Sequence, residues 1–375
     1  MSKVAKQVAA GVFLTLWKAT GYSVKKITRF SPEDKLKTIA IFSTTALGDF
    51  ILNTPAIAAL KARWPDAKLL LIMNQRNEAL AAGSDLFTDI FFWNGKANDV
   101  LKLAGFLRKH RVDATFILHS RTPYDIISAS LGRSTYIFKD VYYNDYQDQE
   151  NFALARFLSA HFDNRKQGNI HLIDQKAQLL QSIGIDMPSK EMFIPAPFTP
   201  ERPEKTFVGI HAGASSLERC WPVEKFAQVI EMLLAQHPEL EIVLIGANAE
   251  KALNQRIIDA LTGQQARVHN LVGTTNLIQL AAKIAGFTCL VVGDTGPLHI
   301  AVALKTPTVG LYGGQMYVDG AAPMQDTALH HVLISDDENV GISRIDVADV
   351  YSAINQCLVA NPVLNASAHA TEPNR

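Results

Sequence analysis

The sequence lacks any excess of charge, any pair of closely spaced cysteines and any long apolar run. The 36 basic residues balance the 36 acidic ones, so the chain has no basic surface for nonspecific nucleic-acid binding, and nucleic acid is not an expected partner. The three cysteines, Cys220, Cys289 and Cys357, lie far apart without a C-x-x-C. This spacing disfavours a zinc site or a disulfide framework and fits a reducing compartment.

Several widespread enzyme motifs are absent as well. The chain contains no G-x-G-x-x-G, which disfavours a dehydrogenase, and no P-loop, G-x-S-x-G or H-E-x-x-H. It also has no Asp-x-Asp triplet, the pattern that suggests a metal held against a nucleotide diphosphate. We therefore expect neither a metal site nor a cofactor, and a chemistry built from less generic parts.

The composition indicates an ordinary folded protein of two domains. Hydrophobic residues make up 48% of the 375 residues and charged residues 19%. This apolar content is ample for a packed core and excludes wholesale disorder. At roughly 100–200 residues per domain, the length favours two domains.

Residues 1–36 form a basic extension with one apolar stretch, VAAGVFLTLW at 8–17. The stretch is too short to cross a bilayer, which takes about 20 apolar residues. Three interpretations stay open. A surface helix would insert Phe13, Leu16 and Trp17 into an anionic membrane. The others are a helix docked on the protein and the core of a secretory signal, although no convincing cleavage site follows.

From Thr38 onward, short apolar strands alternate with helical stretches. The expected strands are 38–43, 68–73, 89–94 and 114–119, and the expected helices include 55–64, 100–109 and 173–183. Continuous apolar strands separated by helices predict a parallel sheet covered on both faces. We assign residues 37–187 to an N-terminal domain.

A linker and a second alternating series follow. Five prolines fall between 188 and 203, which predicts a linker at 188–204. The second domain, 205–345, has expected strands at 206–211, 241–246, 289–294 and 308–313, the last closing the series, and helices at 223–237, 249–261, 277–285 and 298–305. A helix at 346–360 and a disordered polar tail at 361–375 complete the chain. Two similar α/β halves predict two Rossmann-like, doubly wound domains facing a cleft.

Ligands of doubly wound sheets bind at the carboxyl ends of the strands, and the loop TTALGD (44–49) follows the first strand. Gly48 would let a substrate approach the backbone closely. Asp49, expected just before a helix, can accept a proton from an attacking hydroxyl. The alternative is that Asp49 only caps that helix, where aspartate is favoured.

Two loops of the second domain also carry polar and small residues. In HAGASSLERCWP (211–222), the hydroxyls of Ser215 and Ser216 and the cation of Arg219 suit a phosphate. The alternative is a surface loop with an unremarkable arginine. In GDTGPLHIA (293–301), two glycines and Pro297 begin a helix whose free amides form an anion site.

The residues at 48–69, 211–230 and 291–313 resemble family 9 glycosyltransferases, the ADP-heptose:lipopolysaccharide heptosyltransferase group. Order and spacing agree over about 37–315. The resemblance implies a GT-B fold, and an inverting, metal-independent transfer of a heptose-like sugar from a nucleotide diphosphate donor. It implies ADP-heptose as donor and a lipopolysaccharide core or another cell-surface glycan as acceptor.

The same resemblance assigns roles to individual residues. Asp49 matches the family's catalytic base, with Thr45 and Gly48 in the acceptor-side loop. The residues matched to donor binding are Ser215, Ser216, Arg219, Glu250, Asp294, Thr295, Gly296 and His299. Arg219 departs from the lysine that the family usually has two residues before the Trp-Pro pair, and arginine keeps the charge but changes the geometry.

Three functions are compatible with these residues: a glycosyltransferase, a nucleotide-sugar epimerase or hydrolase of the same fold, and a non-catalytic nucleotide-sugar-binding module at a membrane. For the transferase, the expected location is the cytoplasm, peripheral on the inner face of the cytoplasmic membrane where lipopolysaccharide-type acceptors lie. Residues 1–30 would then bind the anionic membrane surface.

Overall fold

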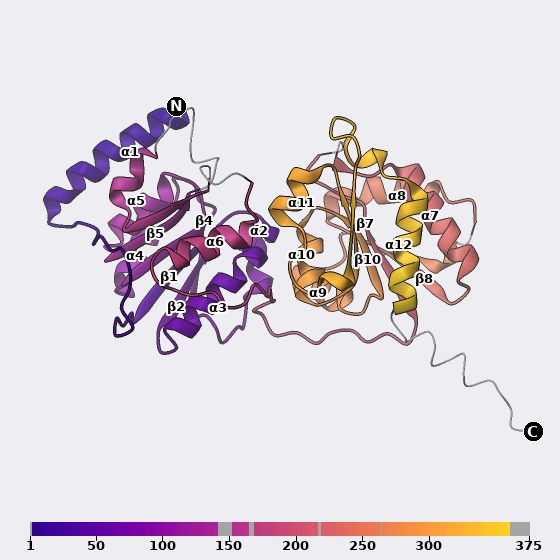
Figure 1. The fold of residues 1–375 in the computed structure, drawn as a ribbon, viewed down its shortest axis with the longest axis horizontal. Coiled ribbons are helices and arrows are strands. Elements are labelled where there is room, and N and C mark those ends of the chain that lie inside the picture. Colours follow the sequence, from indigo (N-terminus) through magenta and orange to yellow (C-terminus); the bar gives the residue numbers. More distant parts are fainter. Residues whose placement is uncertain (1, 142–151, 165–168, 217–218, 264, 361–375) are drawn as a thin grey trace, which may run out of the picture. The chain divides into compact units, whose positions relative to one another are not determined.

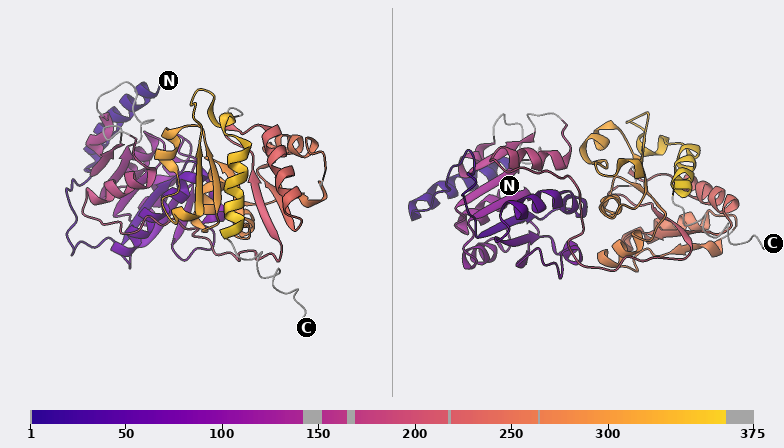
Figure 2. Two further views of the ribbon diagram at one scale, coloured as in Figure 1. Left: turned by 45° about the vertical axis from the view of Figure 1, so that its right-hand side comes forward. Right: turned by 60° about the horizontal axis from the view of Figure 1, so that its bottom comes forward.

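The computed structural model describes residues 2–141, 152–164, 169–216, 219–263 and 265–360. The chain divides into two compact units, unit 1 (Met1–Ala196) and unit 2 (Pro197–Arg375). The division falls within the segment 188–204, which we predicted to be a linker. The tail 361–375, predicted to be disordered, lies outside the described residues. In each unit a parallel sheet carries helices on both faces (Figures 1 and 2).

Unit 1 contains a six-stranded parallel sheet in the order β3-β2-β1-β4-β5-β6. Its strands are β1 (Thr38–Ser43), β2 (Lys68–Met73), β3 (Asp89–Phe92), β4 (Ala114–His119), β5 (Tyr136–Val141) and β6 (Ala160–Asp163). The first four confirm the predicted strands, and β5 and β6 were missed. β5 is buried along its whole length, yet Lys139 and Asp140 at its centre make its sequence read as polar.

Two helical layers cover this sheet. The helices are α1 (Lys3–Trp17), α2 (Leu47–Leu52), α3 (Thr54–Arg63), α4 (Val100–Lys109), α5 (Tyr124–Leu131) and α6 (Leu172–Gln181). α4 packs on α5, and α3 packs on α6. The predicted helices at 55–64, 100–109 and 173–183 are confirmed within two residues at each end.

The N-terminal helix α1 docks on unit 1, where it contacts α5 and the 3-10 helix Ala153–Phe157. Ala10 and Leu14 are buried, and Nε1 of Trp17 donates a hydrogen bond to the carbonyl of Ser130 at 3.2 Å. The docked-helix interpretation is therefore confirmed for this face of α1. No helix within the described residues is long and apolar enough to cross a membrane.

Unit 2 repeats the topology, with the order β12-β11-β10-β7-β8-β9. Its strands are β7 (Thr206–His211), β8 (Leu240–Ile245), β9 (Val268–Asn270), β10 (Cys289–Gly293), β11 (Thr308–Tyr312) and β12 (His330–Ile334). The prediction that 308–313 closes the series is wrong, because β12 pairs with β11. The missed strands β9 and β12 are partly exposed edge strands, which lack the continuous apolar run of a buried parallel strand.

The helices of unit 2 are α7 (Val223–Gln236), α8 (Lys251–Asp259), α9 (Leu277–Ile284), α10 (Gly296–Ala303), α11 (Gln315–Ala321) and α12 (Val347–Ala360). α7 packs on α8 and α12, while α9 packs on α10. The helix predicted at 249–261 begins instead with a 3-10 turn, Asn248–Glu250. Read from β9, the strand order matches that of unit 1, so each unit has one topological switch point, at β1/β4 and β7/β10.

Candidate functional site

Both switch points have polar residues at the carboxyl ends of their strands. In unit 1 these are Asp49, which follows β1, and His119, which ends β4. In unit 2, His211 ends β7, and Asp294 and Thr295 follow β10. Because ligands of doubly wound sheets bind outside the carboxyl ends at a switch point, each unit has its candidate site there.

Asp49 lies in the first turn of α2, and Thr45 and Gly48 belong to the same β1–α2 connection. The prediction that Asp49 precedes the helix is wrong, because α2 already starts at Leu47. Its Oδ2 accepts a hydrogen bond from the Ala46 amide at 3.0 Å, as a capping residue does. Its Oδ1 lies 3.8 Å from Nδ1 of His119, and one-fifth of the side chain is exposed. One carboxylate oxygen therefore caps α2, while the other faces His119 at the carboxyl end of β4.

His119 was missed by the sequence analysis, although a polar residue closing the apolar strand ATFILH was an available signal. Burial lowers its pKa below the ordinary 6.5, against the opposing pull of Asp49. The pKa of Asp49 is also lowered: burial acts to raise it, but His119 and the Ala46 amide outweigh burial. At neutral pH the pair is therefore a carboxylate beside a neutral imidazole.

Two buried ion pairs lie close to this pair. Nζ of Lys139 is 2.8 Å from Oδ2 of Asp125, and Nζ of Lys176 is 2.5 Å from Oδ2 of Asp140. All four side chains are buried, which is costly unless each charge is paired. Lys176 favours the ionised form of Asp49. The surroundings of Asp49 thus stabilise a carboxylate rather than a carboxylic acid.

The electrostatics of unit 1 predict a specific pH profile for the reaction proposed below. His119 becomes protonated only as the pH approaches its pKa, which burial lowers below 6.5, and it then pairs with Asp49. Lys176, Lys139 and Asp140 are the other charges around it. We expect kcat/KM to be level above pH 6.5 and to fall towards the lowered pKa of His119. Asp49 cannot cause this acid limb, since its own pKa lies below 3.8.

The variant His119→Asn should abolish the acid limb, whereas the control His237→Asn, a histidine of unit 2, should keep it. The free energy of unfolding should also decrease as the pH falls below 6.5. The reason is that the His119 imidazole takes up its proton at a higher pH in the unfolded chain than in the folded one. An unchanged limb in His119→Asn would show that another group governs it.

In unit 2, Arg219 connects two of the predicted loops. Its Nη1 donates to Oγ of Ser215 at 3.1 Å, and its Nη2 donates to the carbonyl and Oδ2 of Asp294 at 3.2 and 3.1 Å. Its guanidinium lies 5.1 Å from the ring centre of Tyr317. The carbonyl of Ser216 accepts the Arg219 amide at 3.1 Å. Arginine thus uses its two terminal nitrogens to hold the two loops together, a planar two-pronged geometry that the single ammonium nitrogen of a lysine does not reproduce.

Glu250 lies beside the loop that follows β7. Its Oε2 is 3.5 Å from Nε2 of His211 and accepts the Ala247 amide at 2.6 Å. Nδ1 of His211 lies 3.3 Å from Oγ1 of Thr295. A Cβ at Gly213 would be 1.7 Å from Oε1 of Glu250, so only glycine permits this approach. Burial acts to raise the pKa of Glu250, but His211 and the Ala247 amide lower it below its ordinary value.

The third predicted stretch forms the connection from β10 to α10. Thr295 is the N-cap of α10, and Gly296 is its first residue. Pro297, expected at the first helical position, occupies the second, where its missing amide is equally harmless. His299 is buried in the first turn, with 5% of its surface exposed. Pro297 has no amide hydrogen and the Leu298 amide donates to the carbonyl of Thr295 at 3.0 Å, so the Gly296 amide is the one that a ligand beside the Asp294–Arg219 pair could use.

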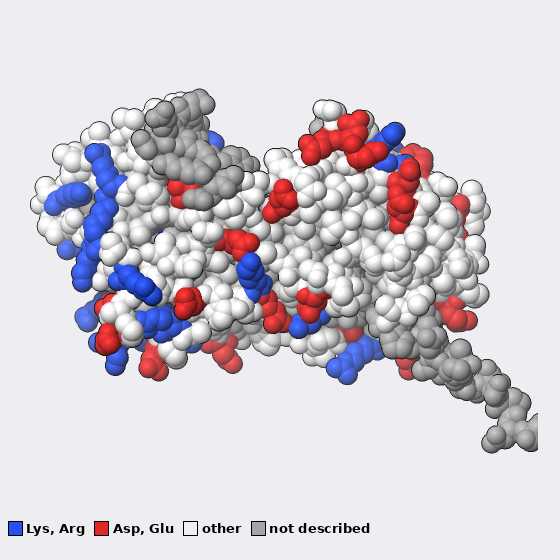
Figure 3. Space-filling model, in the orientation of Figure 1, with Lys and Arg blue, Asp and Glu red and all other residues white. Residues whose placement is uncertain are grey.

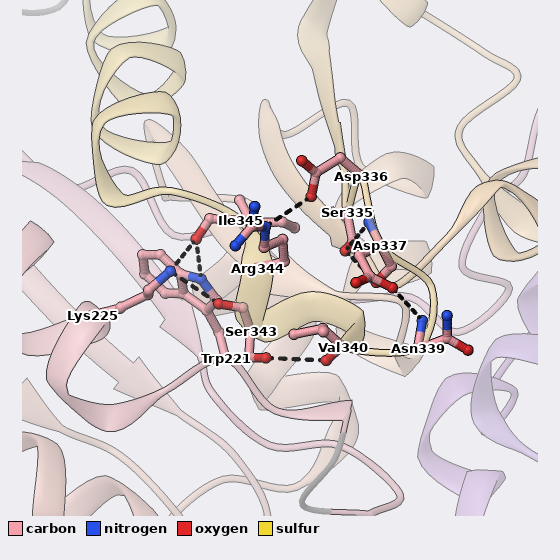
Figure 4. Close-up of polar contacts among 10 residues, drawn as sticks. All are labelled: Trp221, Lys225, Ser335, Asp336, Asp337, Asn339, Val340, Ser343, Arg344 and Ile345. Atoms are coloured by element: carbon pink, nitrogen blue, oxygen red, sulfur yellow. Dashed lines mark hydrogen bonds and ion pairs between the residues drawn. The ribbon is translucent and has the colours of Figure 1, made fainter.

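A cavity of about 370 Å³ opens beside Arg219 and Asp294. Tyr317 and the segment 338–343 also line it. The loop that follows β7 and the start of α7 hold this wall: Nε1 of Trp221 donates to the carbonyl of Ile345 at 3.0 Å, and Nζ of Lys225 donates to the same carbonyl at 2.8 Å (Figure 4). Tyr317 and this segment could not be predicted from the sequence, because they carry no motif and border the unpredicted β12.

Chemically, the groups in unit 2 suit an anion, and unit 1 presents a carboxylate that can accept a proton. In unit 2 these groups are a guanidinium, a serine hydroxyl and the Gly296 amide at the start of α10. Within the residues that the structure describes, no group of three or more histidine, cysteine or acidic side chains could hold a metal ion.

Two Rossmann-like units of the same topology, joined by one linker, define a GT-B fold. The sequence model of glycosyltransferase family 9 (heptosyltransferase) matches residues 104–332, and the chain belongs to this family. It is therefore a glycosyltransferase, and family membership favours this function over the epimerase, hydrolase and binding-module alternatives.

Individual relatives agree with this assignment. The chain is 25% identical to lipopolysaccharide heptosyltransferase 3 of Escherichia coli, over 72% of this chain and 82% of that protein. It is 26% identical to lipooligosaccharide heptosyltransferase 2 of Campylobacter jejuni, over 83% and 88%. Its fold is similar to that of the E. coli ADP-heptose lps heptosyltransferase II, with a TM-score of 0.71 at 20% identity over 86% of this chain and 99% of that one.

Proposed function

We propose that this protein transfers a heptose from ADP-heptose to a lipopolysaccharide core or a related glycolipid, with inversion at the anomeric carbon and without a metal ion. The proposal depends mainly on one observation: the Arg219 side chain contacts both Ser215 and Asp294 at the edge of a cavity. A cation held in this way suits the diphosphate of a nucleotide sugar. The heptosyltransferase relatives support the identity of the sugar and the acceptor.

The donor is assigned to unit 2. The diphosphate would lie against the guanidinium of Arg219, the Ser215 and Ser216 loop and the Gly296 amide that begins α10, because these groups are positive or donate hydrogen bonds. Glu250 would accept hydroxyls of the ribose, while Asp294, Thr295 and His299 contribute to holding the diphosphate and the sugar. ADP as the nucleotide is supported by the name of the structural relative.

Asp49 is the proposed catalytic base, with Thr45 and Gly48 beside the acceptor. The acceptor hydroxyl oxygen attacks the anomeric carbon while its proton passes to Asp49. The bond from the anomeric carbon to the diphosphate oxygen breaks, and its electron pair leaves with ADP. Entry opposite the leaving group inverts the configuration. The negative charge that develops on the diphosphate is stabilised by Arg219 and the Gly296 amide.

The acceptor's chemistry also supports a location. A lipopolysaccharide precursor is amphiphilic and lies at a membrane surface, so the proposal includes a cytoplasmic enzyme peripheral to the inner face of the cytoplasmic membrane.

A donor screen by thermal shift tests the proposal directly. ADP at about 100 times its dissociation constant should stabilise the protein by ~2.7 kcal/mol, and UDP, GDP and CMP should stabilise it less. EDTA should leave both the ADP shift and the transfer to a lipopolysaccharide core acceptor unchanged. A larger shift with UDP or GDP would overturn the assigned nucleotide. A requirement for a divalent cation would overturn the metal-independent mechanism.

A further inference from the structure

The outward surface of α1 is the most concentrated exposed apolar patch among the described residues. Four of the nine exposed large hydrophobic side chains lie on this one helix, and the other five are scattered over both units. The four are Val8 (59% exposed), Val12 (57%), Phe13 (40%) and Leu16 (69%). We call them the outer face of α1. Clusters of this kind mark interaction sites, whereas single exposed apolar residues are ordinary.

The helix is apolar on two opposite sides. Ala10, Gly11 and Leu14 are buried against unit 1. Val8, Val12 and Leu16 follow one another at four-residue spacing and therefore share a stripe, which points away from the buried side. No charged residue occurs between Lys6 and Lys18. A surface helix normally turns charged residues to the solvent, so an apolar outer face is unexplained by folding of unit 1 alone.

Basic residues lie on α1 and directly after it: Lys3 and Lys6 belong to the helix, and Lys18 follows its last residue. Residues 2–32 contain six lysines or arginines and no acidic residue, although the whole chain has no net charge. The body of unit 1 adds Arg108, whose guanidinium lies 5.7 Å from the ring centre of Trp17, and Arg156, whose Nη2 donates to Oγ1 of Thr15 at 3.4 Å. Figure 3 shows basic side chains gathered at the end of unit 1 that carries α1.

We propose that the outer face of α1 inserts into the interface of a bilayer rich in anionic phospholipid. The apolar stripe enters the boundary between headgroups and acyl chains, and the surrounding lysines and arginines contact the phosphates. Because its inner side is already docked, α1 holds unit 1 itself at the membrane rather than tethering it through a flexible segment. The benefit of membrane binding rests on the proposed function, since it would keep the enzyme where its glycolipid acceptor lies.

Vesicle flotation of the full-length protein tests this inference. The protein should float with vesicles of phosphatidylethanolamine and phosphatidylglycerol, bind poorly to pure phosphatidylcholine, and dissociate as the salt concentration rises. The double variant Phe13→Ser/Leu16→Ser should bind the vesicles at least about tenfold more weakly, because it lacks the carbon atoms that Phe13 and Leu16 would bury in the bilayer. Leu16 is 69% exposed, and Phe13, 40% exposed, stacks on Trp17 of the same helix with ring centres 6.4 Å apart, so the variant's thermal melting should stay close to that of the wild type.

Leu101→Ser/Val359→Ser is the matched control. It removes two apolar side chains that are more exposed than Phe13 and Leu16, 77% and 80%, from α4 and α12, and it should float like the wild type. A second variant, Lys3→Gln/Lys6→Gln, should weaken binding to anionic vesicles while leaving the apolar face intact. Equal binding of the wild type and the Phe13→Ser/Leu16→Ser variant would overturn the inference.

A second copy of the chain is the competing occupant of this face. Sedimentation velocity would reveal it as a concentration-dependent dimer that dissociates in Phe13→Ser/Leu16→Ser, and such a dimer without flotation would overturn membrane binding. Flotation needs neither donor nor acceptor, so its failure is distinct from failure of the proposed function. On a delipidated, water-soluble acceptor the double variant should retain the wild-type turnover.

Discussion

Replacing Asp49 with asparagine is expected to lower kcat/KM for sugar transfer by about 10³-fold, within the range measured for loss of a general base. Asparagine cannot take the proton from the acceptor hydroxyl. The dissociation constant for ADP should stay at the wild-type value, because every group assigned to the donor belongs to unit 2. Steady-state kinetics and calorimetric titration with ADP measure the two effects separately.

Asp49 also caps α2, and the choice of asparagine separates the two roles. Its amide oxygen can still accept the Ala46 amide, so the melting temperature should change little. Asn276→Ala is the matched control, since Asn276 caps α9 through the amides of Ile278 and Gln279. That variant should lose about 1 kcal/mol of stability and keep its turnover. Near-normal transfer by Asp49→Asn would refute its role as the base.

Loss of the Arg219 side chain is the second large effect expected. Arg219→Met should lower kcat by about 10²–10³-fold, as removal of one preorganised donor to a developing oxyanion does. Binding of ADP should weaken as well, because the guanidinium also contacts the ground-state diphosphate. Arg219→Lys should recover part of the rate, since lysine restores the charge but not the planar, two-pronged geometry in which Arg219 contacts Ser215 and Asp294.

Arg344→Met controls for the general loss of a cation. Arg344 belongs to unit 2, pairs with Asp336 at 3.2 Å and is mostly exposed, so its removal should alter neither kcat nor stability appreciably. Equal rates for Arg219→Met and the wild type would show that another group stabilises the leaving diphosphate.

Most of the strands that could be predicted from the sequence are buried: β1, β2, β4, β7, β8, β10 and β11 read as continuous apolar runs because helices cover both faces of a parallel sheet. The half-buried edge strand β3 was predicted as well, because DIFFWN is itself a mostly apolar run. β5 escaped prediction because Lys139 and Asp140 interrupt its run, and their partners Asp125 and Lys176 are supplied by α5 and α6. Such pairing across elements has no local sequence signal.

The candidate site likewise has residues that could be predicted from the sequence and contacts that could not. Asp49, Arg219 and Asp294 were indicated by their places after predicted strands, and Glu250 by resemblance alone. The contacts of Asp49 with His119 and of Glu250 with His211 depend on which strands become neighbours. The wall at 338–343 follows an edge strand with no apolar run and carries no motif.

By itself, the sequence determined the alternating α/β pattern, the residues that follow the buried strands, and an N-terminal apolar segment with lysines on both sides of it. These properties are local, because they depend on side-chain type and spacing within one segment. The tertiary structure decided which strand ends meet, which charges are paired in the interior, and which side of α1 is left to the solvent. Those outcomes depend on packing between residues far apart in the chain, as with Trp17 and Ser130.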